Sequence, residues 1–332
     1  MRASLAQGFL SFSIVVFYLA MTQSSRSPKP QGNIPVQTIV ISAITWGVLS
    51  LFFYLLFGIK VTLGEQADSW YAIGTYIFEQ VAYLGAALLC FRNWENRQMV
   101  SGRTVWLLLG LGTFLYFLGN FFFGIWELLF GLDPDISLGD LFFLPCYICL
   151  GWGMILAILP RRLNMGMLQW GLVVTVGILG AFGTYLLINF ANAQAATIVP
   201  AASAAVEAAP NNAPGWANQL DQMLSPLSEL VGKLYIVSDV ALLVIAFTLL
   251  LAFWGGRFAQ SWRMIAAASF CLYVSDIWFY YATTTNPDYI SGQILEVGWV
   301  FSAILFAIGA ALEYDVSTRS TRRAGSRRRS AN

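Results

Sequence analysis

Histidine is absent from the 332 residues of this chain, and charged residues make up only 11% of it. Without an imidazole the chain has no histidine-based catalytic triad, no imidazole metal site and no haem held by histidine. A P-loop and a dinucleotide-binding fingerprint are also missing from the sequence. We therefore expect a protein that is not an enzyme, uses no cofactor and binds no nucleic acid.

Cysteine is scarce, and all four residues lie in apolar stretches where disulfide bonds are rare: Cys90, Cys146, Cys149 and Cys271. Two of them, Cys146 and Cys149, have a spacing that places both on one helical face and allows a metal pair. Packing is the more common role of such cysteines. The sequence therefore leaves a metal site undecided.

Hydrophobic residues are abundant, at 58% of the chain. They gather into runs of about 20 residues, the length that a helix needs to cross a hydrocarbon core of about 30 Å. Because backbone groups in lipid must be satisfied within their own segment, the sequence predicts an all-α, polytopic membrane helix bundle with eight transmembrane helices. The predicted ranges are 35–58, 71–91, 104–130, 138–159, 168–190, 231–255, 262–284 and 291–312.

The basic residues alternate between the connections of these predicted helices. Every Lys and Arg except Arg2, Lys60 and Lys233 lies in a connection on one predicted side, and these connections are 22–34, 92–103, 161–162, 257–263 and 319–329. By the positive-inside rule this side faces the cytoplasm. We therefore expect segment 22–34 and the C-terminus in the cytoplasm and the other connections, which are mainly acidic, outside.

The N-terminal segment is the least certain part of this topology. Residues 8–22 form an apolar stretch that is shorter than the other spans. A cleaved signal peptide is one interpretation, but it would export Arg26 and Lys29. We favour a short ninth helix or an interfacial segment, so residues 1–34 are predicted as a short hydrophobic segment followed by a cytoplasmic linker.

Two stretches of the chain resemble each other, which indicates an internal repeat. The first is "LYFLGNFFFGIWELLFGLDPDISLGD", which ends at Asp140, and the second is "LYVSDIWFYYATTTNPDYISGQ", which ends at Gln293. Upstream, the sequence around Glu79 parallels that around Asp239. We infer two parallel four-helix units, 35–160 and 161–312, of a kind that often places a site between its halves.

Two polar segments interrupt or follow these units. The outer connection 191–228 is rich in Ala, Pro and Asn, so we expect a flexible exposed loop with an interfacial turn near Trp216. The basic tail 313–332 is too polar to fold alone and is expected to be disordered. Its arginines suit anionic lipid head groups, although enforcement of topology explains them equally well.

Carboxylates inside the spans are the most informative residues, because a charge in hydrocarbon is costly and usually faces a bundle interior or water. With the predicted orientation they all lie in the outer half of the membrane, where only Lys233 near the mouth is basic. Protons or an external cation must therefore neutralise them. Helical spacing adds polar and aromatic side chains to the same faces. The predicted ligand-binding residues are Glu79, Asn120, Glu127, Asp239, Asp276, Glu296, Tyr76, Tyr83, Tyr235, Tyr273, Tyr280 and Trp299.

An outward-opening pocket of this composition suits a metal cation, an amine held by cation–π contacts, or a proton. The alternative is a purely structural role, in which the carboxylates only hydrogen-bond Tyr hydroxyls and neighbouring helices. The sequence leaves both interpretations open.

The doubled pattern resembles a known family, the multi-helix membrane domains at the N-terminus of bacterial diguanylate cyclases and related signalling proteins. The similar segments are "SLGDLFFLPCYICLGWGMILAILP" at 137–160, "YIVSDVALLV" at 235–244 and "GQILEVGWVFSAILFAIGAAL" at 292–312. The resemblance implies a sensory or ligand-responsive module that passes its signal to an output domain. About 20 residues follow the last predicted helix, so we expect this chain to be without an output domain. Asn120 and Glu296 stand where the relatives are expected to have Asp.

Three functional hypotheses follow. We favour a receptor-like or accessory membrane protein that binds a small cationic or polar ligand and signals through a separate cytoplasmic or membrane protein partner. A cation or proton transporter or channel is the second, and a structural or assembly factor of a membrane complex is the third. The resemblance implies a bacterial cytoplasmic membrane, and an internal membrane is the alternative location.

Overall fold

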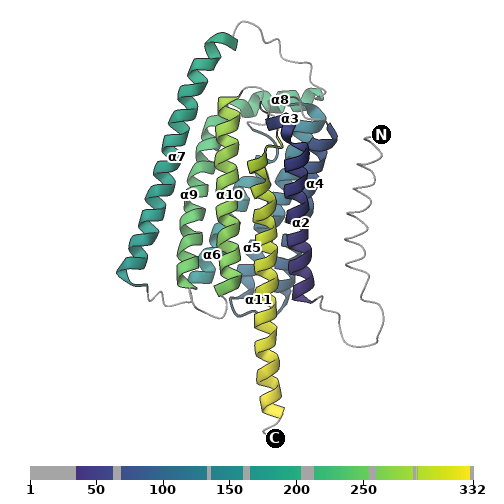
Figure 1. Cartoon of the computed structure of the whole chain (residues 1–332), viewed down its shortest axis with the longest axis vertical. Helices are drawn as coiled ribbons and strands as arrows, with labels where there is room; N and C mark the ends of the chain where they lie inside the picture. Colours follow the sequence, from purple (N-terminus) through teal and green to yellow (C-terminus); the bar gives the residue numbers. More distant parts are fainter. Residues whose placement is uncertain are drawn as a thin grey trace.

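The computed structural model describes residues 35–62, 69–132, 136–159, 165–202, 213–253, 259–286, 289 and 291–329. Within these residues all regular elements are helices, and eight of them are long and apolar enough to cross a membrane. The predicted all-α bundle with eight spans is thus confirmed, and the chain is a multi-pass helical membrane protein (Figure 1). The predicted segment 1–34, with its ninth helix, lies outside the described residues.

Each predicted span coincides with a helix. Most ends differ by a few residues, whereas α7 and α11 continue more than ten residues past the predicted ends. The elements are α2 (Val36–Phe57), α3 (Ile59–Thr62), α4 (Ser69–Glu95), α5 (Arg103–Gly124), the π-helix η1 (Ile125–Phe130), α6 (Asp140–Ile158), α7 (Met167–Ala202), α8 (Gly215–Leu224), η2 (Ser225–Leu227), α9 (Ser228–Ala252), α10 (Ala259–Thr285), η3 (Ile294–Glu296) and α11 (Val297–Arg329). The length of each apolar run decides where a helix forms, because lipid offers the backbone no other hydrogen-bond partner.

The helices pack as two sequential groups that meet along two seams. Helix α5 packs between α4 and α6, and α10 packs between α9 and α11. Across the groups α6 packs on α9 and α11 packs on α4. A two-fold axis along the membrane normal would convert one of these contacts into the other. The two groups are not equivalent, since α11 also packs on α2 whereas α7 packs on α9 and α10. The parallel repeat stays a prediction with which this packing is consistent.

A fully buried aromatic layer fills the bundle toward the end from which the C-terminal helix projects. The Trp262 ring lies 5.9 Å from the Trp106 ring and 4.9 Å from the Phe253 ring, measured between centroids. Leu109 and Leu249 are completely buried in the same core. These side chains join α5, α9 and α10 near one end of the bundle.

Helix α5 ends in the π-helix η1, and this termination is local in origin. Gly131, which follows η1, has a φ of 64°, and its N–H donates to the Glu127 carbonyl at 3.1 Å. Helices often end at a glycine in the left-handed conformation, because this conformation is sterically unfavourable for residues with a Cβ. One-turn π-helices are rare and are frequent at functional sites, and η1 carries Glu127.

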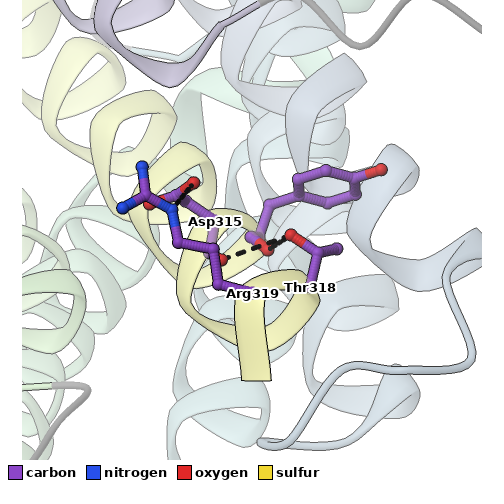
Figure 2. Close-up of polar contacts among 4 residues, drawn as sticks. Asp315, Thr318 and Arg319 are labelled. Carbon is purple, nitrogen blue, oxygen red and sulfur yellow. Dashed lines mark hydrogen bonds and ion pairs between the residues drawn. The ribbon is translucent and has the colours of Figure 1, made fainter. Parts of the chain in front are cut away.

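Helix α11 continues to Arg329, well past the neighbouring helices (Figure 1), where the sequence indicated a disordered tail from residue 313. Figure 2 shows how this extension begins. The Arg319 Nε donates to Asp315 Oδ1 at 2.8 Å, and Thr318 Oγ1 donates to the carbonyl oxygens of Tyr314 and Asp315 at 2.8 and 3.2 Å. The Asp315–Arg319 pair, four residues apart, supports the helix by about 0.2–0.5 kcal/mol.

The outer connection also contains more helix than its composition indicated. Helix α7 runs on to Ala202, and α8 begins at Gly215 beside the expected turn at Trp216. Ala217 of α8 is completely buried against Trp126 and Leu132. Helix α8 therefore lies across one end of the bundle, at the top of Figure 1, which is the predicted outer end.

Candidate functional site

A cavity of about 270 Å³ opens at the end of the bundle that carries the start of α9. Five of its lining residues are carboxylic acids, and eight are aromatic. Among the described residues that line it, none is Lys or Arg. The lining residues are Glu79 of α4; Tyr116, Asn120 and Phe123 of α5; Asp140, Phe143 and Tyr147 of α6; Ser228, Glu229, Gly232, Tyr235, Ile236 and Asp239 of α9; Asp276, Ile277, Phe279, Tyr280, Thr283 and Thr284 of α10; and Trp299 of α11.

Glu79 forms the first acidic group of the cavity and is 5% exposed. The Asn120 Nδ2 donates to its Oε2 at 2.9 Å, and the Tyr54 hydroxyl donates to its Oε1 at 3.4 Å. The amide of Asn120 is a fixed donor, because its N–H bonds do not titrate. Glu79 is thus held by neutral donors from α2 and α5.

Asp239 and Asp276 form the second acidic group, and Tyr147 bridges them. The Tyr147 oxygen lies 2.9 Å from Asp239 Oδ1 and 2.5 Å from Asp276 Oδ2. The Trp299 Nε1 donates to Asp276 Oδ1 at 2.7 Å. Four helices, α6, α9, α10 and α11, therefore meet at this pair of carboxyl groups.

Asp140 contributes a third acidic group at the start of α6. It accepts hydrogen bonds from the Tyr235 hydroxyl at 2.5 Å and from the Ser137 backbone N–H at 2.6 Å. Pro145 lies inside α6 between Asp140 and Tyr147. Since proline has no N–H, it removes one backbone hydrogen bond from this turn of the helix, and its ring is exposed and does not line the cavity.

The charge of the cavity is not balanced by buried cations. Among the described residues, none of Glu79, Asp140, Asp239 and Asp276 takes part in an ion pair. Lys233, the basic residue near the mouth, pairs with Glu229 at 2.6 Å, and the two side chains are 67% and 82% exposed. Exposed pairs of this kind contribute little, so the interior of the cavity stays acidic.

The structure places seven of the twelve predicted residues on the wall of the cavity. These are Glu79, Asn120, Tyr235, Asp239, Asp276, Tyr280 and Trp299. The other five lie beside it. Tyr83 stacks behind Tyr116, with ring centroids 3.8 Å apart, and Tyr273 is turned toward α7, where its hydroxyl lies 3.0 Å from Thr184 Oγ1.

The remaining predicted residues, Tyr76, Glu127 and Glu296, fix the ends of helices next to the cavity. The Tyr76 hydroxyl donates to Glu127 Oε2 at 2.5 Å and so joins α4 to η1. Glu296 accepts from the backbone N–H groups of Gly292 and Gln293 at 2.7 and 3.1 Å in a capping box. The Tyr289 hydroxyl also donates to Glu296. Burial and this carboxyl raise the pKa of Tyr289, which keeps the phenol a donor.

Several wall residues were not predicted from the sequence, above all Tyr147, Tyr116 and Phe143. One signal was present for Tyr147, since it follows Asp140 by seven residues and therefore shares its helical face. For Tyr116 and Phe143 no signal distinguishes them from the many other aromatic residues in the spans.

Together, the bundle and the cavity define a polytopic helical membrane protein with an acidic, aromatic-lined cavity at one end. No family model, no curated protein sequence and no solved structure matches the chain. Within the described part of the chain, no three His, Cys, Asp or Glu side chains converge as ligands for a metal ion.

Proposed function

We propose that this protein is a receptor-like or accessory membrane protein, without catalytic activity, that binds a small cationic or polar ligand in the acidic cavity. The observation that carries the proposal is the composition of the cavity wall, in which five acids and eight aromatic residues occur with no basic residue among those described. Ligand pockets typically enclose about 300–1,000 Å³, so a cavity of about 270 Å³ suits a small ligand.

Signalling through a separate partner is the second part of the proposal, and α11 supports it. Its Trp299 bonds Asp276 in the cavity, and the same helix continues to Arg329 beyond the bundle. At the far end Asn93 Nδ2 donates to the Ala310 carbonyl at 2.8 Å, which fixes α11 to α4. A ligand that shifts Trp299 would therefore change the preferred position of the whole of α11, and a partner bound to its far end could respond to that change. The resemblance to membrane regions of bacterial diguanylate cyclases also favours sensing, in a bacterial cytoplasmic membrane.

A cation or proton transporter is the competing function, because the same carboxylates would form its binding step. The packed rings of Trp106 and Trp262 argue against it, since they fill the bundle interior with apolar side chains beyond the acids that line the cavity. Flux in proteoliposomes that disappears in Glu79→Gln would replace the receptor proposal by transport.

The proposal is tested by thermal unfolding of the detergent-purified protein with amines, metal ions and neutral polar solutes. The wild type is compared with a combined Glu79→Gln, Asp239→Asn and Asp276→Asn variant and with Glu95→Gln, an exposed acid far from the cavity. A ligand at 100 times its Kd adds about 2.7 kcal/mol. We expect this gain in the wild type and Glu95→Gln only. If no compound shifts unfolding and the combined variant is simply less stable, the carboxylates serve packing and a structural or assembly factor is the better description.

A further inference from the structure

The contacts of Tyr147 indicate how many protons Asp239, Asp276 and Tyr147 hold together. A phenol has one hydrogen and so donates to one acceptor at a time. Its oxygen nevertheless lies 2.9 Å from one carboxyl oxygen and 2.5 Å from another. Two carboxylates without a proton only accept, so this arrangement holds at least one proton besides that of the phenol.

The geometry also indicates which residue holds the extra proton. Asp276 accepts one hydrogen bond on each oxygen, from Trp299 Nε1 at 2.7 Å and from Tyr147 at 2.5 Å. That pattern suits an ionised carboxylate. Among the residues that the structure describes, Asp239 accepts no comparable pair of hydrogen bonds; its contact is the one that joins its Oδ1 to the Tyr147 oxygen. Asp239 is therefore the carboxylic acid of the pair, and its O–H donates to the Tyr147 oxygen, whose own O–H donates to the Asp276 carboxylate.

The surroundings supply no cation that replaces this proton. The titratable groups that face the pair from the packed helices are all acids, phenols or a thiol: Glu79, Tyr83, Tyr116, Asp140, Cys146 and Tyr235. Helix α11 adds the neutral donor Trp299, and the one titratable residue of α7, Tyr185, is 60% exposed. A positive charge at the pair must therefore come from the proton or from a ligand.

We propose that the ligand is a small organic ammonium ion and that it binds in exchange for the proton held by the Asp239, Tyr147 and Asp276 group. This inference rests on the ligand-binding role proposed above for the cavity. The Asp239 O–H bond breaks, the proton leaves to water at the mouth, and the ammonium ion faces two carboxylates. Because one positive charge replaces another, the net charge of the cavity does not change. The eight aromatic wall residues stabilise an organic cation through their ring faces.

The experiment titrates the full chain in detergent with choline and tetramethylammonium, which carry no proton of their own. Binding is followed by calorimetry, and proton release by a pH dye in weak buffer. We expect one proton released per cation bound. Because binding releases a proton, the Kd for choline should fall about tenfold for each unit by which the pH rises, as long as the free pair remains protonated.

Asp239→Asn is the diagnostic variant, because its amide N–H occupies the place of the acid O–H and preserves the contact to Tyr147. It should bind choline more weakly than the wild type does at high pH, because only Asp276 remains as a carboxylate, and it should release no proton and show a Kd that does not depend on pH. Glu95→Gln is the matched acid-to-amide control at an exposed position, and it should release protons as the wild type does.

The outcomes separate this inference from the proposed function. If dimethylbutanol, the uncharged carbon isostere of choline, binds as tightly as choline, the cavity is a ligand site but not one for ammonium. Equal binding and release with sodium or calcium also overturns the ammonium assignment. If the wild-type protein binds choline and releases no proton, the exchange is overturned. If none of these probes and no other polar solute binds the wild type, both proposals fail.

Discussion

Replacement of Gly119 by alanine tests how closely α5 and α6 approach behind the cavity. A Cβ built on Gly119 would lie 2.7 Å from two ring carbons of Phe143, which lines the cavity. Carbon atoms in good contact are about 3.5–4.0 Å apart. The Phe143 ring must therefore move by about 1 Å away from residue 119. Because the ring lines the cavity, this movement is toward the cavity.

The expected cost follows from two opposing effects. Overpacking a well-filled interior costs about 1–3 kcal/mol, while a glycine-to-alanine change inside a helix gains up to about 1 kcal/mol from helix propensity. We therefore expect Gly119→Ala to lower the free energy of unfolding by up to about 2 kcal/mol. The displaced Phe143 ring should also narrow the cavity and weaken any ligand found in the thermal screen.

Gly85→Ala is the matched control for this change, because nothing lies within 4 Å of its Cβ in the middle of α4. It should be neutral or stabilising by up to about 1 kcal/mol. Both variants are compared by reversible unfolding in mixed detergent micelles, together with ligand-induced shifts. If Gly119→Ala is as stable as Gly85→Ala and binds as the wild type does, the close approach of α5 and α6 is refuted.

Three further predictions follow from single contacts. Gly232→Leu at the cavity mouth should abolish ligand-induced stabilisation while changing the free energy of unfolding without ligand by no more than about 1 kcal/mol, the gain in helix propensity. Tyr76→Phe removes the donor to Glu127 and should cost on the order of 1 kcal/mol in thermal unfolding. Tyr314→Leu removes the ring that lies 4.1 Å from the Arg92 guanidinium and should cost about 1 kcal/mol, measured in the same way.

Conservative changes at comparable positions provide the controls. At Gly232 an alanine Cβ would meet the Tyr280 ring at 3.5 Å, an ordinary contact, so Gly232→Ala should bind as the wild type does. Tyr185 is 60% exposed, and Tyr185→Phe should leave stability unchanged. An effect of Tyr185→Phe as large as that of Tyr76→Phe would show that the buried hydrogen bond is not the cause.

The spans could be predicted because lipid admits few solutions for a backbone. A run such as 138–159 has to be a helix across the membrane, and α6 (Asp140–Ile158) occupies it. The same rule does not apply to segments outside the lipid. Helix α8 is short and polar on one side, and the arginines near Arg319 are compatible with either a solvated coil or a helix. The structure of these segments depends on packing and local side-chain pairs, which composition does not reveal.

For the site, the acids could be predicted and most of the wall could not. Asp239 and Asp276 stand out because a carboxylate in an apolar run is costly and needs a reason. Tyr147 and Phe143 do not stand out, because aromatic residues in such runs are common. Whether they line a cavity depends on how α6 is rotated against α5 and α9, which is decided by close contacts such as that at Gly119.

Two of the three acidic groups of the cavity are Glu79 with Asn120 and Asp239 with Asp276, at positions that the predicted internal repeat relates. Residue 120 is an amide where residue 276 is an acid. In the first unit Asn120 donates to Glu79, so no exchangeable proton is needed. In the second unit the pair consists of two acids. Asn120→Asp should therefore create a second proton-holding pair, because two adjacent buried carboxylates do not both ionise. The folded variant would then hold a proton that the unfolded chain releases, so its stability should fall as pH rises relative to wild type. Unfolding curves from acid to alkaline pH measure this difference, and parallel profiles for variant and wild type would contradict the pairing of Glu79 with residue 120.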